Sequence, residues 1–401
     1  MQTLGIYVQV PFCASKCSFC NFSSQVAPSA VFDAYVQALE REVESLADIY
    51  EAGGVVPPVD ESDKAAGLLA LPVDTIYLGG GTPSLLGSER LARIVAALEQ
   101  CFRLAAPVEF TIEVTPGSAD ERELERLREL GINRLSIGAQ SFDDHELASV
   151  GRLHSAADTA ELVESARRAG FTNISLDLIA GLPHQTPASW LHSLQAAAGL
   201  APQHVSVYLF EVDEKSRLGN EVLSHGTHYH ADAVPNDEFM ADAYERARIF
   251  LSDHGYAQYE ISNFAQPGFE SRHNRRYWRL DPYVGLGAGA HSFDGFNRWS
   301  NETSPETYQA RLERGDSPIA EVRRLSVEQQ IEEFFFLGLR ERAGVDLGAA
   351  AERWGTSVLE RWQPTIAALH ERGWIEKSDG RIRLPARTHL ISNEIFQEFL
   401  V

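Results

Sequence analysis

Apolar and polar positions follow two different periods along the first two-thirds of the chain. Short runs dominated by apolar residues predict β-strands, and most are followed by a segment with apolar residues at helical spacing. We expect strands at residues 4–10, 74–78, 109–113, 134–137, 173–179, 204–209 and 257–261. We expect helices at residues 31–49, 91–101, 120–130, 156–169, 189–198 and 239–251. This order predicts an α/β fold, a parallel sheet closed into a partial (β/α)6 barrel, with its chemistry at the carboxyl ends of the strands.

The pattern changes near residue 301. Helices are predicted at residues 327–342, 347–354 and 358–372, and the alternation at 374–384 around Ser378-Asp379-Gly380 predicts a hairpin. Helices followed by a hairpin resemble a winged helix. We therefore expect a core domain at residues 1–300 and a C-terminal α+β winged-helix-like domain at 301–401. Residues 50–73 lack a clear period, and we predict an inserted surface loop there.

Charge narrows the classes of partner. The 401-residue chain has a net charge of −22, and acids also exceed bases in residues 327–401. Nucleic-acid binding needs concentrated Lys and Arg, so we expect no nucleic-acid partner and interpret the C-terminal domain as a packing or docking module. No apolar run reaches membrane-spanning length, and we recognise no signal peptide. We expect a cytoplasmic protein, with peripheral attachment to a membrane as the alternative.

Three of the four cysteines are clustered directly after the first predicted strand, at Cys13, Cys17 and Cys20. Three thiolates at this spacing can hold three corners of a [4Fe–4S] cluster, which leaves one iron without a protein ligand. A structural zinc site would need a second ligand pair, and Cys101 stands alone in a predicted helix. Disulfide frameworks are typical of short secreted chains. The spacing therefore favours an iron–sulfur cluster with one open corner.

Polar groups follow several predicted strands. The run Gly79-Gly80-Gly81-Thr82-Pro83 ends the second strand, where glycines permit close approach of a ligand and free N–H groups can bind a carboxylate. Glu113, Gln140, Arg152 and Asp177 stand at or after later strands. A carboxylate can accept from ribose hydroxyls or an ammonium, and Arg can bind a carboxylate. Taken singly, each is explained as well by a salt bridge or a helix cap.

Histidines also gather in an irregular stretch, at His225, His228 and His230. They raise the possibility of a metal site. No acidic or cysteine partner is spaced to complete such a site, so a solvated loop is favoured.

The C-x3-C-x2-C spacing of the cysteines resembles the signature of the radical S-adenosylmethionine (SAM) family. Other segments resemble the coproporphyrinogen III dehydrogenase branch of that family, over nearly the whole chain. These segments are Gly79-Gly80-Gly81-Thr82-Pro83-Ser84, Ile137-Gly138-Ala139-Gln140-Ser141-Phe142, Gly181-Leu182-Pro183, Tyr259-Glu260-Ile261-Ser262-Asn263-Phe264-Ala265 and Ser392-Asn393-Glu394-Ile395-Phe396. The segment His273-Asn274-Arg275-Arg276-Tyr277-Trp278 matches the H-N-x-x-Y-W motif of the heme chaperones in that branch.

The resemblance implies a [4Fe–4S] cluster on Cys13, Cys17 and Cys20, with SAM bound to the open iron. It places eight residues around SAM: Tyr7, Gly80, Gly81, Thr82, Glu113, Gln140, Arg152 and Asp177. In this family an electron from the cluster cleaves SAM to a 5′-deoxyadenosyl radical. Whether SAM is cleaved here or only controls a heme site is left open, so enzyme activity is left open too.

The resemblance also implies heme as a ligand, with His273 as its binding residue. Imidazole is a strong axial ligand of heme iron, and Tyr277 and Trp278 could form an apolar wall for the porphyrin. From the residues alone, a hydrogen-bonded histidine that orients a loop is the simpler explanation.

The function that the resemblance implies is that of a heme chaperone. Its partners would be acceptor hemoproteins, membrane respiratory enzymes among them, and an electron donor for the cluster. The apolar surface of the first helices permits a homodimer without deciding it.

Two rival functions remain, and the sequence departs from the family pattern at two positions. The first rival is coproporphyrinogen III dehydrogenase, whose members carry a further cysteine where this chain has Phe22. The second is a radical SAM enzyme with an unrelated substrate. Thr115 replaces the Asn of an Asn-Pro pair, and its hydroxyl can still make hydrogen bonds.

Overall fold

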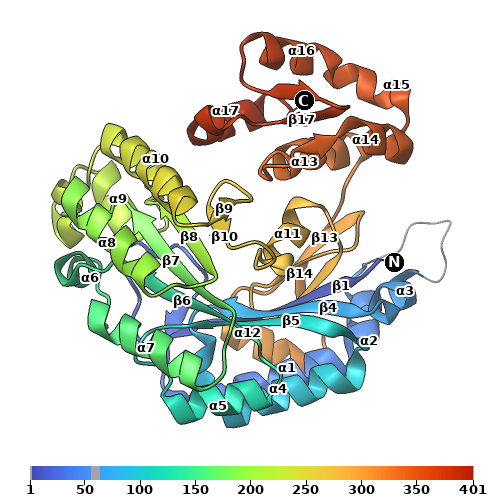
Figure 1. Ribbon diagram of the computed structural model, residues 1–401. Helices are drawn as coiled ribbons and strands as arrows, with labels where there is room; N and C mark the ends of the chain where they lie inside the picture. Colours follow the sequence, from blue (N-terminus) through green and yellow to red (C-terminus); the bar gives the residue numbers. More distant parts are fainter. Residues whose placement is uncertain (1, 56–63, 401) are drawn as a thin grey trace.

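A twelve-stranded sheet forms the centre of the molecule (Figure 1). The structure is a computed structural model, in which residues 2–55 and 64–400 are described. Six strands pair in parallel and in chain order: β1 (Leu4–Val10), β4 (Val73–Gly80), β5 (Leu104–Val114), β6 (Arg134–Gln140), β7 (Ile174–Ala180) and β8 (His204–Leu209). This arrangement confirms the predicted partial (β/α)6 barrel.

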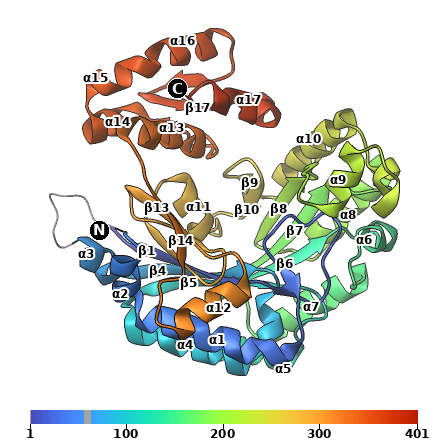
Figure 2. The ribbon, with the colours of Figure 1, turned by 180° about the vertical axis from the view of Figure 1, so that it is seen from behind.

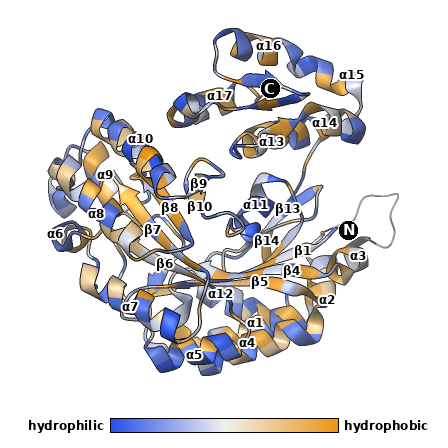
Figure 3. Cartoon of the chain, in the orientation of Figure 1, coloured by the Kyte–Doolittle hydropathy of each residue, from blue (hydrophilic) through white to orange (hydrophobic). Residues whose placement is uncertain are grey.

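The barrel strands are buried on both faces, as is typical of parallel sheets. In β1, Leu4, Ile6, Val8 and Val10 on one face are fully buried, and Gly5 and Gln9 on the other face are buried as well. Figure 3 shows that β7 and β8 are largely hydrophobic, while the outer helices carry many hydrophilic positions. A large hydrophobic core lies between the sheet and its helices, and a smaller cluster that includes Ile179, Leu182 and Met240 accompanies it.

Helices cover the side of the sheet that faces away from the C-terminal domain, as Figures 1 and 2 show for α1, α4 and α5. The helices of the barrel are α1 (Phe32–Glu44), α2 (Leu46–Ala52), α3 (Lys64–Ala70), α4 (Ser88–Cys101), α5 (Glu121–Glu129), α6 (Asp144–Ser149), α7 (Ala156–Arg168), α8 (Pro187–Gly199), α9 (Arg217–Leu223) and α10 (Asp237–Asp253). Several begin at side-chain caps: Ser155 and Asp158 form a capping box at α7, and Thr186 and Ser189 form one at α8. None of the helices within the described ranges is long and apolar enough to cross a membrane.

Additional strands extend the barrel sheet on both sides. One side carries β10 (Asn263–Ala265) and β9 (Ala257–Gln258), and the other carries β11 (Tyr283–Leu286), β12 (His291–Phe293), β13 (Asn297–Asn301) and β14 (Ile319–Arg324). The short helix α11 (Arg272–Trp278) lies between these additions in the chain, and α12 (Pro305–Glu313) connects β13 to β14.

The core domain extends beyond the boundary that the sequence suggested at residue 301. Strand β14 pairs with β13 in the central sheet, and in α12 the buried Tyr308 hydroxyl donates to the buried Glu42 carboxylate at 2.6 Å. Residues 302–324 therefore pack with the core. The physical reason is a long-range contact between α12 and α1, which has no signature in the local pattern.

The C-terminal domain has its own hydrophobic core and a small sheet in the order β15-β17-β16. Its elements are α13 (Val327–Gly338), β15 (Val345–Asp346), α14 (Leu347–Trp354), α15 (Thr356–Leu359), α16 (Gln363–Glu371), β16 (Glu376–Ser378), β17 (Arg381–Arg383) and α17 (Ser392–Gln397). The antiparallel β16–β17 pair is the hairpin predicted around Asp379. Helices with a three-stranded sheet confirm the winged-helix-like domain.

A short antiparallel contact joins this domain to the core. The N–H group of Arg342 donates to the carbonyl oxygen of Tyr259 at 2.9 Å, beside an isolated bridge between Glu260 and Glu341. In Figure 1 the domain lies on the open side of the barrel, opposite α1 and α4.

Some helix and strand limits differ from the sequence-based expectation. The helix predicted at 31–49 breaks at Ser45, whose φ of −113° and ψ of 16° leave the helical region. The predicted loop at 50–73 contains the end of α2 and all of α3, and its residues 56–63 lie outside the described part of the chain. The helix predicted at 358–372 is interrupted by a 3-10 turn at Glu360–Trp362, after which α16 begins at Gln363 with Pro364 in its first turn.

Candidate functional site

The loop that follows β1 brings three cysteines to one cavity. Cys13, Cys17 and Cys20 all line it, and all three are free thiols. The short strand β2 (Phe12–Cys13) pairs with β3 (Gln25–Val26), which closes the loop at its base. The fourth cysteine, Cys101, is exposed at the end of α4 and does not line the cavity.

The surroundings of the thiols fit thiolate ligands. Nη1 of Arg152 donates to Sγ of Cys17 at 3.5 Å, and the hydroxyl of Ser24 lies 4.0 Å from Sγ of Cys20. Burial raises the pKa of Cys13, while hydrogen bonds from Ser24 and Thr82 oppose that rise. Three unpaired thiols with nearby donors fit three corners of a [4Fe–4S] cluster.

Among the residues that the structure describes, no three His, Cys, Asp or Glu side chains are arranged to hold a single metal ion. The thiolates of a four-iron cluster each bind a different iron, so they do not converge on one point. In the histidine-rich stretch, His230 Nδ1 lies 3.1 Å from His184 Nε2, and His228 Nδ1 lies 3.4 Å from a Glu221 oxygen.

The glycine run after β4 supports the cysteine loop. The N–H groups of Gly81 and Thr82 donate to the carbonyl oxygens of Val10 and Phe12 at 2.8 and 2.7 Å. A Cβ at Gly81 would lie 2.4 Å from the Phe12 carbonyl oxygen, so only glycine permits this approach. The N–H group of Gly80 donates to Oε2 of Glu113. The expectation that the N–H groups of this run are free to bind a carboxylate is therefore wrong for Gly80, Gly81 and Thr82.

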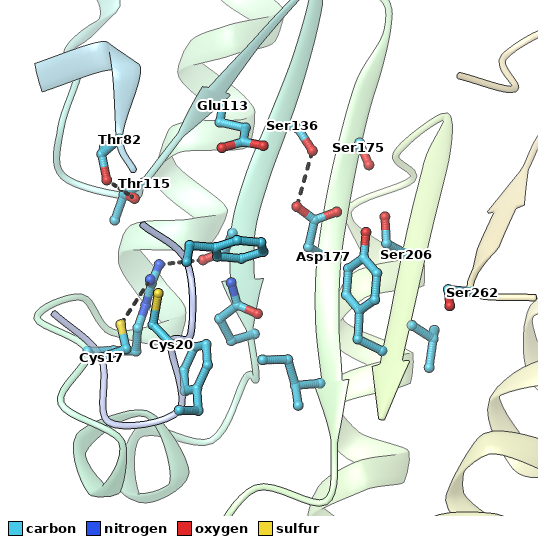
Figure 4. A pocket seen from close by; sticks show the side chains of 18 of the residues that line it. Cys17, Cys20, Thr82, Glu113, Thr115, Ser136, Ser175, Asp177, Ser206 and Ser262 are labelled. Carbon is cyan, nitrogen blue, oxygen red and sulfur yellow. Dashed lines mark hydrogen bonds between the residues drawn. The ribbon is translucent and has the colours of Figure 1, made fainter. Parts of the chain in front are cut away.

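The cavity has a volume of about 750 Å³ and runs along the inner side of β4 to β8. Of the eight residues predicted to surround SAM, seven line it: Gly80, Gly81, Thr82, Glu113, Gln140, Arg152 and Asp177. Figure 4 shows Glu113, Ser136, Asp177 and Ser206, which come from four neighbouring strands, around the same space. The structure thus brings these residues together with the cysteines.

Glu113 is a half-buried carboxyl near the end of β5. It accepts from the N–H group of Gly80 and from the Tyr77 hydroxyl, both at 3.0 Å. Burial, with a smaller contribution from Asp177, raises the pKa of Glu113 to about 7. Near neutral pH the protonated and ionised forms of this carboxyl are therefore similarly populated. A cationic ligand would favour the ionised form.

Gln140 and Arg152 shape the end of β6. Gln140 has a φ of 66°, and the pairing of β6 with β7 shifts register between Ile137 and Gln140. Arg152 Nη2 donates to the Gly138 carbonyl oxygen at 2.7 Å, and its buried Nε has no partner among the described residues. In the loop after β5, the Thr115 hydroxyl lies 3.3 Å from the Thr82 hydroxyl. Thr115 therefore makes a hydrogen bond, as its hydroxyl was expected to do.

Two predicted site residues do not reach the cavity wall. The hydroxyl of Tyr7 donates to Oε1 of Gln9 at 2.8 Å, and its ring stacks at 6.0 Å on Tyr77, which does line the cavity. His273 is 1 % exposed and lies behind the same Tyr77 ring, at 5.3 Å between centroids.

Both ring nitrogens of His273 are engaged. Nδ1 lies 3.0 Å from the Thr75 hydroxyl, and Nε2 lies 2.8 Å from the Tyr277 hydroxyl. Burial lowers the pKa of His273 to about 3, so its imidazole is neutral. In this conformation His273 is a hydrogen-bonded residue that fixes α11 to β4.

Other residues of the cavity wall escaped the sequence analysis. Ser136, Ser175 and Ser206 are inward-facing hydroxyls on β6, β7 and β8, and polar residues inside otherwise apolar strands are a signal that could have identified them. The C-terminal domain contributes Arg340 and His389, for which the sequence carries no local signal.

Comparisons with known proteins identify both parts of the chain. The Radical SAM superfamily model matches residues 7–197, and the HemN C-terminal domain model matches residues 325–388. The solved structure of coproporphyrinogen III oxidase (HemN) from Escherichia coli, described as a radical SAM enzyme, is similar to this protein. The match covers 100% of this chain and 90% of the HemN chain. Its TM-score is 0.84 at 24% identity, which shows a shared fold.

Two curated relatives match over nearly their whole length. Heme chaperone HemW of Bacillus subtilis is 35% identical over 98% of this chain and 98% of its own. Heme chaperone HemW of Mycobacterium tuberculosis is 32% identical over 100% of this chain and 95% of its own. With these identities over the whole chain, and a cysteine loop and barrel of the expected kind, the chain belongs to the HemW family of radical SAM proteins.

Proposed function

We propose that this protein is a heme chaperone that binds a [4Fe–4S] cluster, SAM and heme and delivers heme to acceptor hemoproteins. The observation that carries the proposal is the extent of the cavity. It runs from the three cysteines, past the polar strand ends, to the C-terminal domain, within a volume of about 750 Å³. The full-length relatives that are named heme chaperones support the same function.

The cysteine loop and the neighbouring strands of the cavity wall suit a cluster with bound SAM. Cys13, Cys17 and Cys20 would hold the cluster, which supplies an electron and a binding position for SAM. The carboxyls of Glu113 and Asp177 would accept hydrogen bonds from the ammonium or hydroxyl groups of SAM. Tyr7 would act indirectly, by supporting Tyr77 from behind.

The assignment of His273 to heme iron stays a prediction. In the described conformation its nitrogens are bonded to Thr75 and Tyr277, so iron binding would require at least the Tyr277 contact to break. The electron donor, membrane respiratory acceptors and a homodimer likewise stay predictions.

Phe22 distinguishes this function from coproporphyrinogen dehydrogenation. It stands at the rim of the cavity, 65% exposed, where the dehydrogenases resembled by this chain carry a cysteine. A phenylalanine ring cannot exchange protons or bind metal as a thiol does.

The test is an anaerobic titration of the reconstituted protein with heme, followed through the Soret band. We expect saturable binding, and transfer of the bound heme to an apo-hemoprotein on mixing. In parallel, coproporphyrinogen III with SAM and a reductant should show no loss of carbon dioxide by mass spectrometry. Absence of saturable heme binding, or decarboxylation of the porphyrinogen, would overturn the proposal.

A further inference from the structure

The cavity ends between the two domains, and this end has a chemistry of its own. We call it the interdomain end and define it by Ile261, Ser262 and Asn274 of the core and Arg340, His389 and Asn393 of the C-terminal domain. It contains no residue assigned above to the cluster or to SAM. Its only guanidinium within the described residues is that of Arg340, and burial lowers the pKa of His389 to about 4, so that imidazole is neutral.

Arg340 has unused hydrogen-bonding capacity. Its Nε is buried without a partner among the described residues, and its Nη2 is 3.8 Å from Oε2 of Glu260, beyond hydrogen-bonding distance. A guanidinium carries five N–H donors, and a buried donor without a partner is costly. The group is nevertheless held in place, because it lies over the Trp278 ring with 4.4 Å between its central carbon and the ring centroid.

Glu260 forms an ion pair with this guanidinium but no hydrogen bond. The carboxyl is fully buried, and its Oε1 accepts from the N–H group of Ser262 at 2.8 Å and from the Asn263 side chain at 2.5 Å. Its Oε2 has no hydrogen-bond partner among the described residues. Burial raises the pKa of Glu260, and the charge of Arg340 opposes that rise.

Two other arginines near the interdomain end differ from Arg340 in their hydrogen bonding. Arg275 and Arg279 each make two hydrogen bonds to the carboxylate of Glu341, at distances between 2.9 and 3.2 Å. Neither of them lines the cavity. Arg275 and Arg279 are therefore hydrogen-bonded within the protein, whereas Arg340 lines the cavity and has no hydrogen-bond partner for its Nε among the described residues.

We propose that the interdomain end of the cavity binds a carboxylate of the ligand, and that Arg340 is its anchor. A carboxylate can accept two hydrogen bonds from a guanidinium. The Trp278 ring, on which the guanidinium of Arg340 lies, holds the plane of that group in a fixed orientation. This inference rests on the proposed function, which makes the ligand heme and the carboxylate a propionate. SAM also carries a carboxylate, so the test distinguishes the two sources.

The test compares heme with heme dimethyl ester, in which both propionates are neutral. The full-length, cluster-reconstituted protein is titrated with each probe, as wild type and as Arg340→Met, which keeps an apolar stem on Trp278. We expect the substitution to weaken heme binding by about 10- to 100-fold, and to leave ester binding unchanged. Arg340→Lys should give an intermediate loss of heme affinity, because lysine keeps the positive charge but cannot make the bidentate contact of a guanidinium.

Two controls accompany this comparison. Arg353→Met removes another arginine of the C-terminal domain that stacks on a tryptophan, Trp354 at 4.5 Å, but does not line the cavity. It should leave the affinity for both probes unchanged. A SAM titration of Arg340→Met should match wild type.

The outcomes separate the two proposals. Equal loss of affinity for heme and its ester in Arg340→Met and Arg340→Lys would make Arg340 a structural residue and overturn the inference. Equal binding of both probes by wild type would overturn it as well. Loss of SAM binding with heme binding unchanged would assign Arg340 to the carboxylate of SAM instead. If the wild-type protein binds neither heme nor its dimethyl ester, the proposed function itself is overturned.

Discussion

Nη1 of Arg152 donates to Sγ of Cys17 at 3.5 Å, although the two residues are 135 positions apart in the chain. The same guanidinium donates to the Gly138 carbonyl oxygen, so it ties the cysteine loop to the end of β6. A cation beside one thiolate stabilises the more negative state of a cluster held there.

Arg152→Met should make the cluster harder to reduce. We expect its reduction potential to fall by on the order of 60 mV, which is about a tenfold change in a one-electron equilibrium. Potentiometric titration followed by electron paramagnetic resonance measures this change. Arg314→Met is a matched control, because Arg314 is exposed and pairs with Asp316 away from the cavity. An unchanged potential would show that Arg152 does not influence the cluster.

The pKa of Glu113 predicts a pH dependence of SAM binding. Because the pKa lies near 7, the group is largely protonated at pH 6 and largely ionised at pH 8. Binding of the cationic ligand needs the ionised form, so affinity should rise by about tenfold over this interval. Isothermal titration in buffers of different ionisation enthalpy should show proton release near pH 7. Glu113→Gln should bind SAM weakly and lose the pH dependence that comes from this carboxyl. Any pH dependence that remains in the variant then comes from titration of SAM itself.

The Tyr277 hydroxyl tests the role of His273. If His273 Nε2 binds heme iron, its hydrogen bond to Tyr277 must first break. Tyr277→Phe removes that bond and keeps the ring, so heme binding should tighten by about fivefold, which corresponds to one ordinary hydrogen bond. His273→Ala should then cancel the gain in the double variant. Unchanged heme affinity in Tyr277→Phe would argue against His273 as the iron ligand.

The contact between Tyr308 and Glu42 tests whether residues 302–324 belong to the core. Glu42 is buried, and it also accepts from the Gly287 N–H group and the Asn301 side chain. Tyr308→Phe should lower the free energy of unfolding by about 1–3 kcal/mol. Burial raises the pKa of Glu42 to about 7, so the carboxylate that accepts most strongly forms above that pH. The loss should therefore be larger at pH 8 than at pH 6.

Urea unfolding at both pH values measures this loss. Tyr229→Phe serves as the control, because Tyr229 is 41% exposed. A loss no greater than that of the control would mean that α12 contributes little to the stability of the core.

Local patterns predicted much of the fold. The strands Leu4–Val10 and His204–Leu209 have the limits expected from the sequence, because a buried parallel strand is a continuous apolar run with clear ends. The hairpin around Asp379 followed from its turn residues. The break at Ser45 was missed, because apolar spacing on both sides continues without interruption.

The candidate site was predictable only in part. Seven of the eight residues expected around SAM share the cavity. Most of them stand at or just after the ends of parallel strands, which meet at one edge of the sheet, whereas Asp177 lies within β7 and Arg152 follows α6. The bonded N–H groups of Gly81 and Thr82 could not be foreseen, because their acceptors belong to another strand and its loop.

The sequence by itself determined the three-cysteine loop and the barrel that carries it, because both depend on spacing and periodicity over a few residues. The tertiary structure alone decided which side chains reach the cavity. It places His273 behind Tyr77 and brings Arg340 into the wall, 80 positions after Glu260. The physical reason is that access to a cavity depends on how segments distant in the chain pack against one another.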